Sequence, residues 1–200
     1  MQKRQFLAAA LGAAAIPAFA KTQNKPVQAA GPTLLTITGA IGAGNRGALD
    51  PALDQMMSKQ KIQFDKAQTY DFAALGVLPA VTIKPTLEYD AKAHTLSGPL
   101  LDDVIAHAAG AELPGNVSVL LRAVDGYVVQ VGLADLRKYR FIVATHLDGR
   151  PMPLGGLGPL WAVYDADRFP DMAARPLPAR FALCPWALYY IELRIEQRLA

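Results

Sequence analysis

The clearest periodic pattern in the chain lies between residues 95 and 110, and it is helical. Its apolar residues recur at i, i+3, i+4 and i+7, the spacing of one helix face: Leu101, Val104, Ile105 and Ala108. Ser97 or Gly98 can cap the start of this helix, and Pro99 suits its first turn. Gly110 can end it in the left-handed conformation that glycine adopts without strain. The pattern predicts a helix that turns one apolar face towards a core.

A β-hairpin is expected after this helix. Residues 117–131 form two runs rich in Val on either side of Asp125-Gly126, a pair that tolerates the positive φ angles of a two-residue turn. Alternation along the first run predicts one apolar face and one mixed face. Residues 139–145 predict a further strand. A helix followed by an antiparallel hairpin favours an α+β or mainly β domain over alternating βαβ units.

The remainder of the chain predicts shorter elements separated by turns. Strands are expected at Thr33–Ile41, Lys61–Phe64, Val81–Leu87, Leu160–Tyr164 and Trp186–Arg194, and helices at Pro51–Lys59 and Asp71–Leu78. Pro85 places its strand at a sheet edge or bulge, because proline cannot donate a backbone hydrogen bond. Residues 165–180 are polar and interrupted by prolines, and we expect a loop there.

A glycine-rich segment after the first predicted strand matches a nucleotide-binding pattern. Gly42 to Gly47 read G-x-G-x-x-G, and the acidic residue Asp65 follows. The pattern requires a βαβ unit, but Pro51 interrupts the required helix, and the next predicted strand is short and polar. We interpret the segment as a turn that leads into a helix. The alternative, a nicotinamide dehydrogenase, requires a βαβ unit over residues 33–65.

The N-terminus has the parts of an export signal peptide. Lys3 and Arg4 precede an apolar run, and Ala18-Phe19-Ala20 forms a small-x-small cleavage site. The run is shorter than the ~20 residues that span a bilayer, although a retained anchor is an alternative. The basic pair also resembles a twin-arginine signal. The sequence predicts a periplasmic protein with a signal peptide at 1–20, a linker at 21–32 and one domain over 33–200.

The net charge lies mostly in this signal. The chain has 20 Lys and Arg against 17 Asp and Glu, a net charge of +3, and removal of Lys3 and Arg4 leaves +1. No basic cluster with interleaved aromatic residues remains, so the sequence predicts no nucleic-acid partner. The single cysteine, Cys184, cannot form an internal disulfide, and we expect it to be buried and inert.

Candidate reactive groups give little sign of a specific reaction. Asp165, Asp167 and Asp171 lack the glycine and the final glutamate of a calcium loop, so we expect a solvated turn there. The histidines lack metal-ligand spacing, and the sequence predicts no metal site. Trp161 and Trp186 could line a pocket for a flat ligand or anchor the core. The three histidines are His94, His107 and His146.

The order of the segments resembles a known family. LLTITGAI, YDFAALGVLPAVTIKPTLEY, TLSGPLLDDVIAHAAGA, VLLRAVDGYVVQVGLADL, HLDGRPMP with GPLWAVYD, and WALYYIELR follow one another between Leu34 and Arg194. Together they resemble the oxidoreductase molybdopterin-binding domain, which has the sulfite-oxidase-like fold, in its short exported bacterial version. SGPLLDDVI, the Asp125-Gly126-Tyr127 turn and GPLWAVYD are the most specific parts. The resemblance implies a mixed, β-rich α+β domain with a few short helices.

The chain departs from this family at the metal ligand. Catalytic members bind molybdenum through a cysteine thiolate in the segment that corresponds to Val81–Ser97, where this chain has no cysteine. Threonine hydroxyls are poor substitutes for a soft anionic sulfur. Trp161 stands where larger members tend to carry an anion-binding arginine. The resemblance therefore implies the fold more firmly than the redox reaction.

Two functions follow from this combination. The first is an exported ligand-binding or accessory protein without molybdenum catalysis, which holds a pterin-like or other small ligand or reports to a membrane-protein partner. The alternative is a periplasmic molybdopterin-dependent oxidoreductase with an atypical metal ligand. Motif position suggests four ligand-binding residues: Asp125, Tyr127, Gly158 and Trp161.

Overall fold

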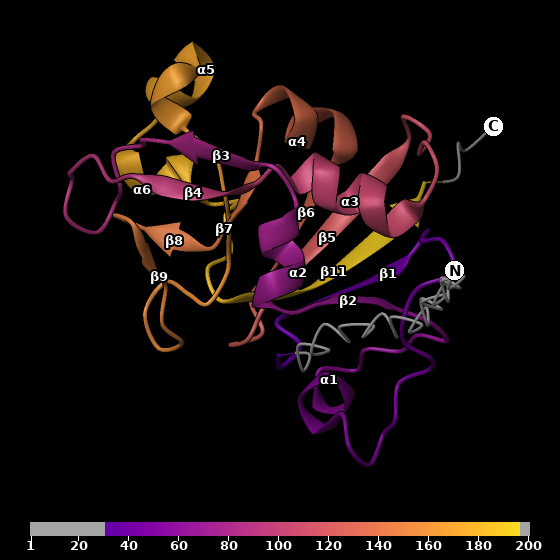
Figure 1. The fold of residues 1–200 in the computed structure, drawn as a ribbon. Helices are drawn as coiled ribbons and strands as arrows, with labels where there is room; N and C mark the ends of the chain where they lie inside the picture. The colour runs from indigo at the N-terminus through magenta and orange to yellow at the C-terminus, as the bar shows by residue number, and fades with distance from the viewer. Residues whose placement is uncertain (1–30, 197–200) are drawn as a thin grey trace, which may run out of the picture.

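A five-stranded sheet forms the centre of the molecule. The computed structural model describes residues 31–196, so the predicted signal peptide and most of the predicted linker lie outside it. The strands run in the order β2-β1-β11-β5-β6, with β1 and β11 parallel and the other neighbours antiparallel (Figure 1). Their bounds are β1 Leu35–Gly39, β2 Gln68–Tyr70, β5 Val117–Ala123, β6 Val128–Gly132 and β11 Leu188–Ile195. The first and last strands of the described chain therefore lie side by side.

Helix α3 (Leu101–Ala109) packs on one face of this sheet, as the apolar spacing predicts. All four predicted core residues are buried, and Gly110 ends the helix with a φ of 65°. The predicted start is wrong, because Leu100 is the N-terminal cap and Ser97 lies in a strand, β4 (Leu96–Pro99). The Leu101 N–H donates instead to the carbonyl of Phe141 at 2.8 Å. The carbonyl of Phe141, the residue just before Ile142, thus satisfies the first N–H of the helix, which a side-chain cap was expected to satisfy.

The opposite face of the sheet is covered as well. The prediction gave β5 one apolar and one mixed face, but Ser118 and Leu120 on the mixed face are also buried. Leu120 packs there with Ile62, Tyr189 and Tyr190 in a second, smaller core. The segment that covers this face includes helix α1 (Gln55–Lys59), at the bottom of Figure 1. A sheet packed on both faces explains why β5 is apolar along nearly its whole length.

Two smaller sheets extend the main core. One has the order β3-β4-β8-β9, with β3 at its edge, and the other pairs β10 with β7. The strand predicted over Val81–Leu87 ends at Ile83, before Pro85. Their remaining bounds are β3 Ala80–Ile83, β7 Ile142–Ala144, β8 His146–Leu147, β9 Arg150–Pro151 and β10 Trp161–Val163. Gly98 lies where β4 passes β7, and its neighbour Ser97 accepts a 2.9 Å bond from the Thr145 N–H. These sheets position the loop between β3 and β4.

Several short elements differ from the prediction. Helix α2 (Phe72–Val77) is confirmed, and Asp71 caps it by accepting a 2.7 Å bond from the Ala74 N–H. The helix expected over 51–59 forms only in its second half, and residues 61–64 do not form a strand. Four helical segments were not expected: α4 (Leu133–Lys138), the 3-10 turn η1 (Ala166–Arg168), α5 (Pro170–Ala173) and α6 (Leu177–Arg180). They are too short to show helical periodicity in the sequence.

The glycine-rich segment is not part of a βαβ unit. The strand after β1 is β2, which pairs with it antiparallel, and the dehydrogenase alternative is therefore wrong. Gly44 takes a φ of 74° where the chain passes the backbone of Ala67. The Lys66 ammonium donates to the carbonyls of Ile41 and Gly42, at the start of the glycine-rich turn. The fold is α+β, mostly sheet with a few short helices, as predicted.

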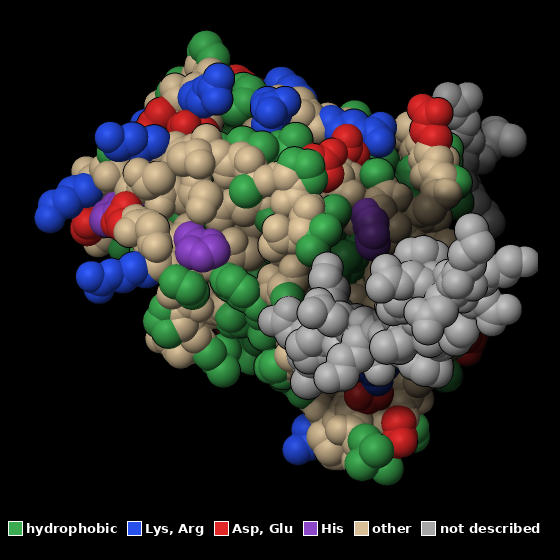
Figure 2. All heavy atoms as spheres, in the orientation of Figure 1, with side chains coloured by type: hydrophobic (Ala, Val, Ile, Leu, Met, Phe, Trp, Pro, Cys, Tyr) green, Lys and Arg blue, Asp and Glu red, His purple; other side chains and the backbone are tan. Residues whose placement is uncertain are grey.

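The described surface is mixed in charge. On the face drawn in Figure 2, Lys and Arg side chains lie along the rim with acidic residues beside them rather than in one patch. Within residues 31–196, no helix combines the length and the apolar character that crossing a bilayer requires.

Candidate functional site

A solvent-open cavity of about 220 Å³ lies where three segments of the chain meet. One is the tip of the β3–β4 loop, another is the β5–β6 turn, and the last is the stretch from α6 to the start of β11. The lining residues are Glu88, Tyr89, Ala123, Asp125, Tyr127, Pro178, Phe181, Ala182, Cys184, Pro185 and Trp186. The cavity therefore includes the segment in which the sequence resemblance places a metal-binding cysteine.

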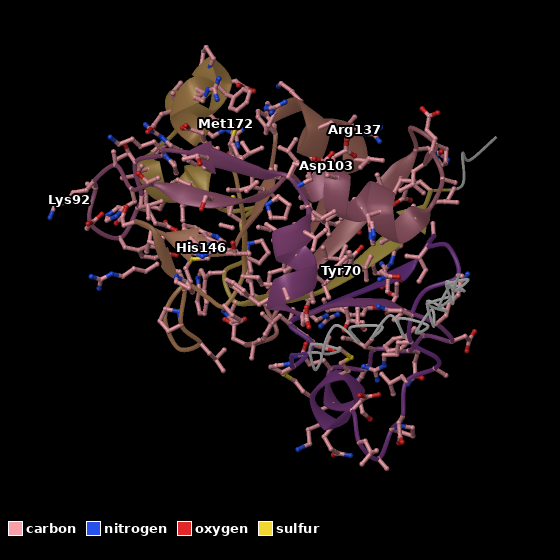
Figure 3. The ribbon with its side chains drawn as sticks, in the orientation of Figure 1. Tyr70, Lys92, Asp103, Arg137, His146 and Met172 are labelled. Atoms are coloured by element: carbon pink, nitrogen blue, oxygen red, sulfur yellow. The ribbon has the colours of Figure 1, made fainter. Side chains whose placement is uncertain are left out.

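The β3–β4 loop is a folded structure that presents Glu88 and Tyr89 at its tip. Its two arms are joined by a 2.9 Å bond from the Leu87 N–H to the Lys92 carbonyl, and Leu87 is buried. Lys92 marks the outer end of this loop in Figure 3. Burial, followed by the nearby charge of Glu88, raises the pKa of Tyr89 to about 12. The phenol of Tyr89 is therefore uncharged at any physiological pH.

An ion-pair cluster holds the returning arm of this loop. The His94 ring lies between two carboxylates, with Nδ1 2.7 Å from Asp148 and Nε2 3.0 Å from Asp90. Hydrogen bonds to Asp148 and Asp90 raise the pKa of His94, and the same contacts lower the pKa of both carboxyls. Asp148 also accepts a 2.9 Å bond from the Thr95 N–H. The cluster thus ties the loop to the β8–β9 turn.

Two aspartates hold the outgoing arm. Asp165 accepts a 3.2 Å bond from the Lys84 N–H, and Asp167 accepts a 2.7 Å bond from the Thr86 N–H. Arg180, at the end of α6, pairs with Asp167 at 2.8 Å. The carboxylates that partly resemble a calcium loop therefore fasten the cavity-lining loop to the 165–180 segment. Within the described residues, no three potential ligands among His, Cys, Asp and Glu converge in a way that could hold a metal ion.

The β5–β6 turn supplies the second wall. It has three residues rather than the predicted two, because the Ala123 N–H donates to the Tyr127 carbonyl and Gly126 takes a φ of 92°. Asp125 accepts a 2.9 Å bond from the Tyr127 N–H, which shapes the turn. The Tyr127 hydroxyl donates to the Ala182 carbonyl at 2.9 Å and connects this turn to the third segment. Both predicted residues of this turn therefore line the cavity.

The third wall rests on Trp161, which is buried behind it. Its indole N–H donates to the Cys184 carbonyl at 2.9 Å, and its ring centroid lies 6.2 Å from that of Phe181. Of the two readings of this tryptophan, core anchor or pocket residue, the structure supports the core anchor, because Trp161 is 1% exposed. Trp186 has the other role: it is 38% exposed and lines the cavity.

The structure thus brings together two of the four residues suggested by motif position. Asp125 and Tyr127 line the cavity, Trp161 supports it from behind, and Gly158 is buried against Met152 without lining it. Sequence reasoning missed Glu88, because the segment around it was considered only for a metal ligand that could replace the cysteine. Charge and aromaticity at Glu88-Tyr89 were the available signal, but the pairing of distant segments was needed to interpret them.

The other histidines lie away from the cavity. His107 is exposed, as predicted, and its Nδ1 lies 2.7 Å from the hydroxyl of Tyr70, whose pKa burial raises to about 12. His146, on β8 and labelled in Figure 3, contacts the ring of Phe72 of α2, and the ring centroids lie 5.5 Å apart. Each has a local structural partner, and the two do not share a site.

The lining residues do not fit a molybdopterin cofactor. Cys184 is the only thiol, it is buried as predicted, and burial raises its pKa, which opposes the thiolate that a metal requires. Glu88 and Asp125 are anionic, whereas the phosphate of this cofactor calls for basic partners. Among the described residues that line the cavity, there is no Lys, Arg or His.

A scan against protein-family models matches no family, and a search of curated proteins finds no matching relative.

Proposed function

We propose that this protein is an exported small-molecule-binding protein that does not carry out molybdenum redox chemistry. Its scaffold resembles the sulfite-oxidase-like molybdopterin-binding domain, and the cavity at the β3–β4 loop is its binding site. One observation carries the proposal: the turn Asp125-Gly126-Tyr127, a specific motif of the resemblance, meets Glu88-Tyr89 across an open cavity. In the segment where the resemblance implies a metal-binding thiolate, this chain presents a carboxylate and a phenol, Glu88 and Tyr89, to the cavity.

The construction of the site supports binding. Asp165, Asp167 and Asp148 accept backbone hydrogen bonds from both arms of the loop, and Tyr127 connects the opposite wall to Ala182. A site whose walls are fixed before a ligand arrives loses less conformational entropy on binding. The ligand must be smaller than a typical drug molecule, because pockets for such molecules usually measure ~300–1,000 Å³.

A second candidate is the molybdopterin-dependent oxidoreductase with an atypical ligand. The observation in its favour is that Cys184 lies in the cavity wall. Against it, burial and the nearby carboxylate of Glu88 both raise the pKa of this thiol. A metal would have to displace the thiol proton against both burial and the neighbouring carboxylate. These costs rank the oxidoreductase second.

Elemental analysis separates the two candidates. Protein purified from the periplasm of a host that makes molybdopterin should contain far less than one molybdenum per chain. Cys184→Ala is the matched control, because it removes the only thiol and leaves the cavity charges unchanged. Stoichiometric molybdenum in the wild type that disappears in the variant would refute the proposal and establish the oxidoreductase.

A further inference from the structure

The cavity combines exposed aromatic rings with negative charge. Tyr89, Tyr127 and Trp186 are 56%, 49% and 38% exposed, and all three line it. Monomeric proteins usually bury aromatic side chains of this size, so three exposed rings around one cavity indicate a binding surface. Glu88 and Asp125 contribute the only charged side chains among the described lining residues. A ligand of this cavity therefore meets aromatic faces and carboxylates together.

We propose that the ligand is a small organic cation, such as a quaternary ammonium or an alkylamine. This inference rests on the proposed function, in that it takes the cavity to be the ligand site, and it adds the class of ligand. Aromatic faces attract cations through the ring quadrupole, and tryptophan and tyrosine are the strongest such partners. The two carboxylates supply the compensating charge, and their field concentrates cations in the cavity.

The local chemistry keeps the rings suited to this role. Tyr89 stays neutral, because partial burial and Glu88 raise its pKa to about 12, an effect that a smaller, opposite contribution from the neighbouring Trp186 does not cancel. The Tyr127 hydroxyl is engaged by the Ala182 carbonyl, so this ring is held in place rather than rotating. The neighbours of the cavity thus keep a neutral phenol and a fixed ring beside the carboxylates.

Other ligand classes fit less well. An anion would face Glu88 and Asp125 without a basic partner among the described lining residues. A metal ion needs more oxygen ligands than two carboxylates provide, and no cluster of three potential metal ligands is found within residues 31–196. A neutral apolar ligand would bury carboxylates without compensating them, which costs free energy.

Isothermal titration of the purified full chain tests the inference with a matched ligand pair. Choline and 3,3-dimethylbutan-1-ol have nearly the same shape and differ in the positive charge. We expect choline to bind and the alcohol to bind at least roughly tenfold more weakly. The affinity for choline should also fall as NaCl rises, because the carboxylates are open to solvent. Tetramethylammonium and butylamine serve as further probes.

Variants locate the binding in this cavity. Trp186→Leu and Glu88→Gln should each weaken choline binding by roughly five- to tenfold. Glu112→Gln, an exposed glutamate that does not line the cavity, is the control and should leave the affinity unchanged. Circular dichroism of each variant verifies that the fold is retained.

Three outcomes overturn the inference. They are equal binding of the alcohol and choline, binding of pterin 6-carboxylate or inorganic phosphate in preference to the cations, and no heat with any of the three cations. The molybdenum content is measured in a separate experiment. A failure of the cation inference therefore does not decide the proposed function, which the molybdenum content tests.

Discussion

The contact between Gly98 and β7 allows one substitution to be worked out in detail. Gly98 is buried in β4, and a Cβ built on it would lie 1.9 Å from the Val143 carbonyl oxygen and 2.8 Å from the carbon of that carbonyl. Ordinary contact begins at 3.4 Å. In Gly98→Ala the two backbones must therefore separate by about 1.5 Å, because the obstacle is main chain and has no rotamer to change.

The cost follows from what this separation breaks. Overpacking a rigid core costs ~1–3 kcal/mol. Two backbone bonds flank the contact, Thr145 N–H to Ser97 at 2.9 Å and Leu101 N–H to Phe141 at 2.8 Å. Loss of each adds ~1 kcal/mol. We expect Gly98→Ala to lower the free energy of unfolding by ~3–5 kcal/mol, a large part of the 5–15 kcal/mol of a typical domain.

Urea denaturation followed by circular dichroism measures this effect, with the midpoint shifted and the slope unchanged. Gly76→Ala is the matched control: a Cβ at Gly76 meets nothing within 4 Å, and the residue lies in helix α2. This control should be neutral or stabilising by up to ~1 kcal/mol. If Gly98→Ala unfolds within 0.5 kcal/mol of the wild type (about the error of such a measurement), the close approach of β4 and β7 is wrong.

Three further predictions concern the walls of the cavity. Trp161→Phe leaves the Cys184 carbonyl without its donor and should lower the free energy of unfolding by ~1–3 kcal/mol in urea melts; an unchanged midpoint would contradict this. Cys184 should react with Ellman's reagent at pH 8 only in urea, because burial raises its pKa, and rapid labelling of the native protein would disprove its burial. His94→Ala should destabilise most between roughly pH 4 and 6.5, where His94 is protonated and its two carboxylates are ionised. Because the pKa of His94 is raised, its contribution is complete below about pH 6.5 and disappears as the pH rises through the raised value. Because the carboxyl pKa values are lowered, their contribution is lost as the pH falls through those values. The difference in urea midpoint between the wild type and His94→Ala should therefore shrink from pH 6 to pH 9, and a difference that grows over this range would contradict the ion-pair cluster.

Local patterns predicted the elements whose residues determine their own conformation. Helix α3 has enough turns to show its periodicity, and Gly110 marks its end. Helix α4 has only six residues with Leu133 and Leu136 inward, too few for a helical repeat to be distinguished from the end of a strand. The predicted start of α3 was wrong for a different reason. The backbone N–H of Leu101 donates to the carbonyl of Phe141, a partner distant in sequence that no local pattern reveals.

The cavity was predictable only in part. Asp125 and Tyr127 were found because the turn that holds them has a strong local signature. Glu88 required knowledge of which loop faces that turn, and this depends on strand pairing across distant parts of the chain. Trp161 and Trp186 follow similar turns, and their opposite exposure depends on the position of β10 in the core.

The position of β11 also governs when the protein can fold. This strand lies between β1 and β5, so a nascent chain that has not reached Leu188 holds two half-sheets, each with an open hydrogen-bonding edge. Contacts between segments so distant in sequence slow folding, because a long loop must close first. The central sheet can therefore close only when the chain through β11 is present, and truncation upstream of β11 should yield a chain that aggregates through those edges.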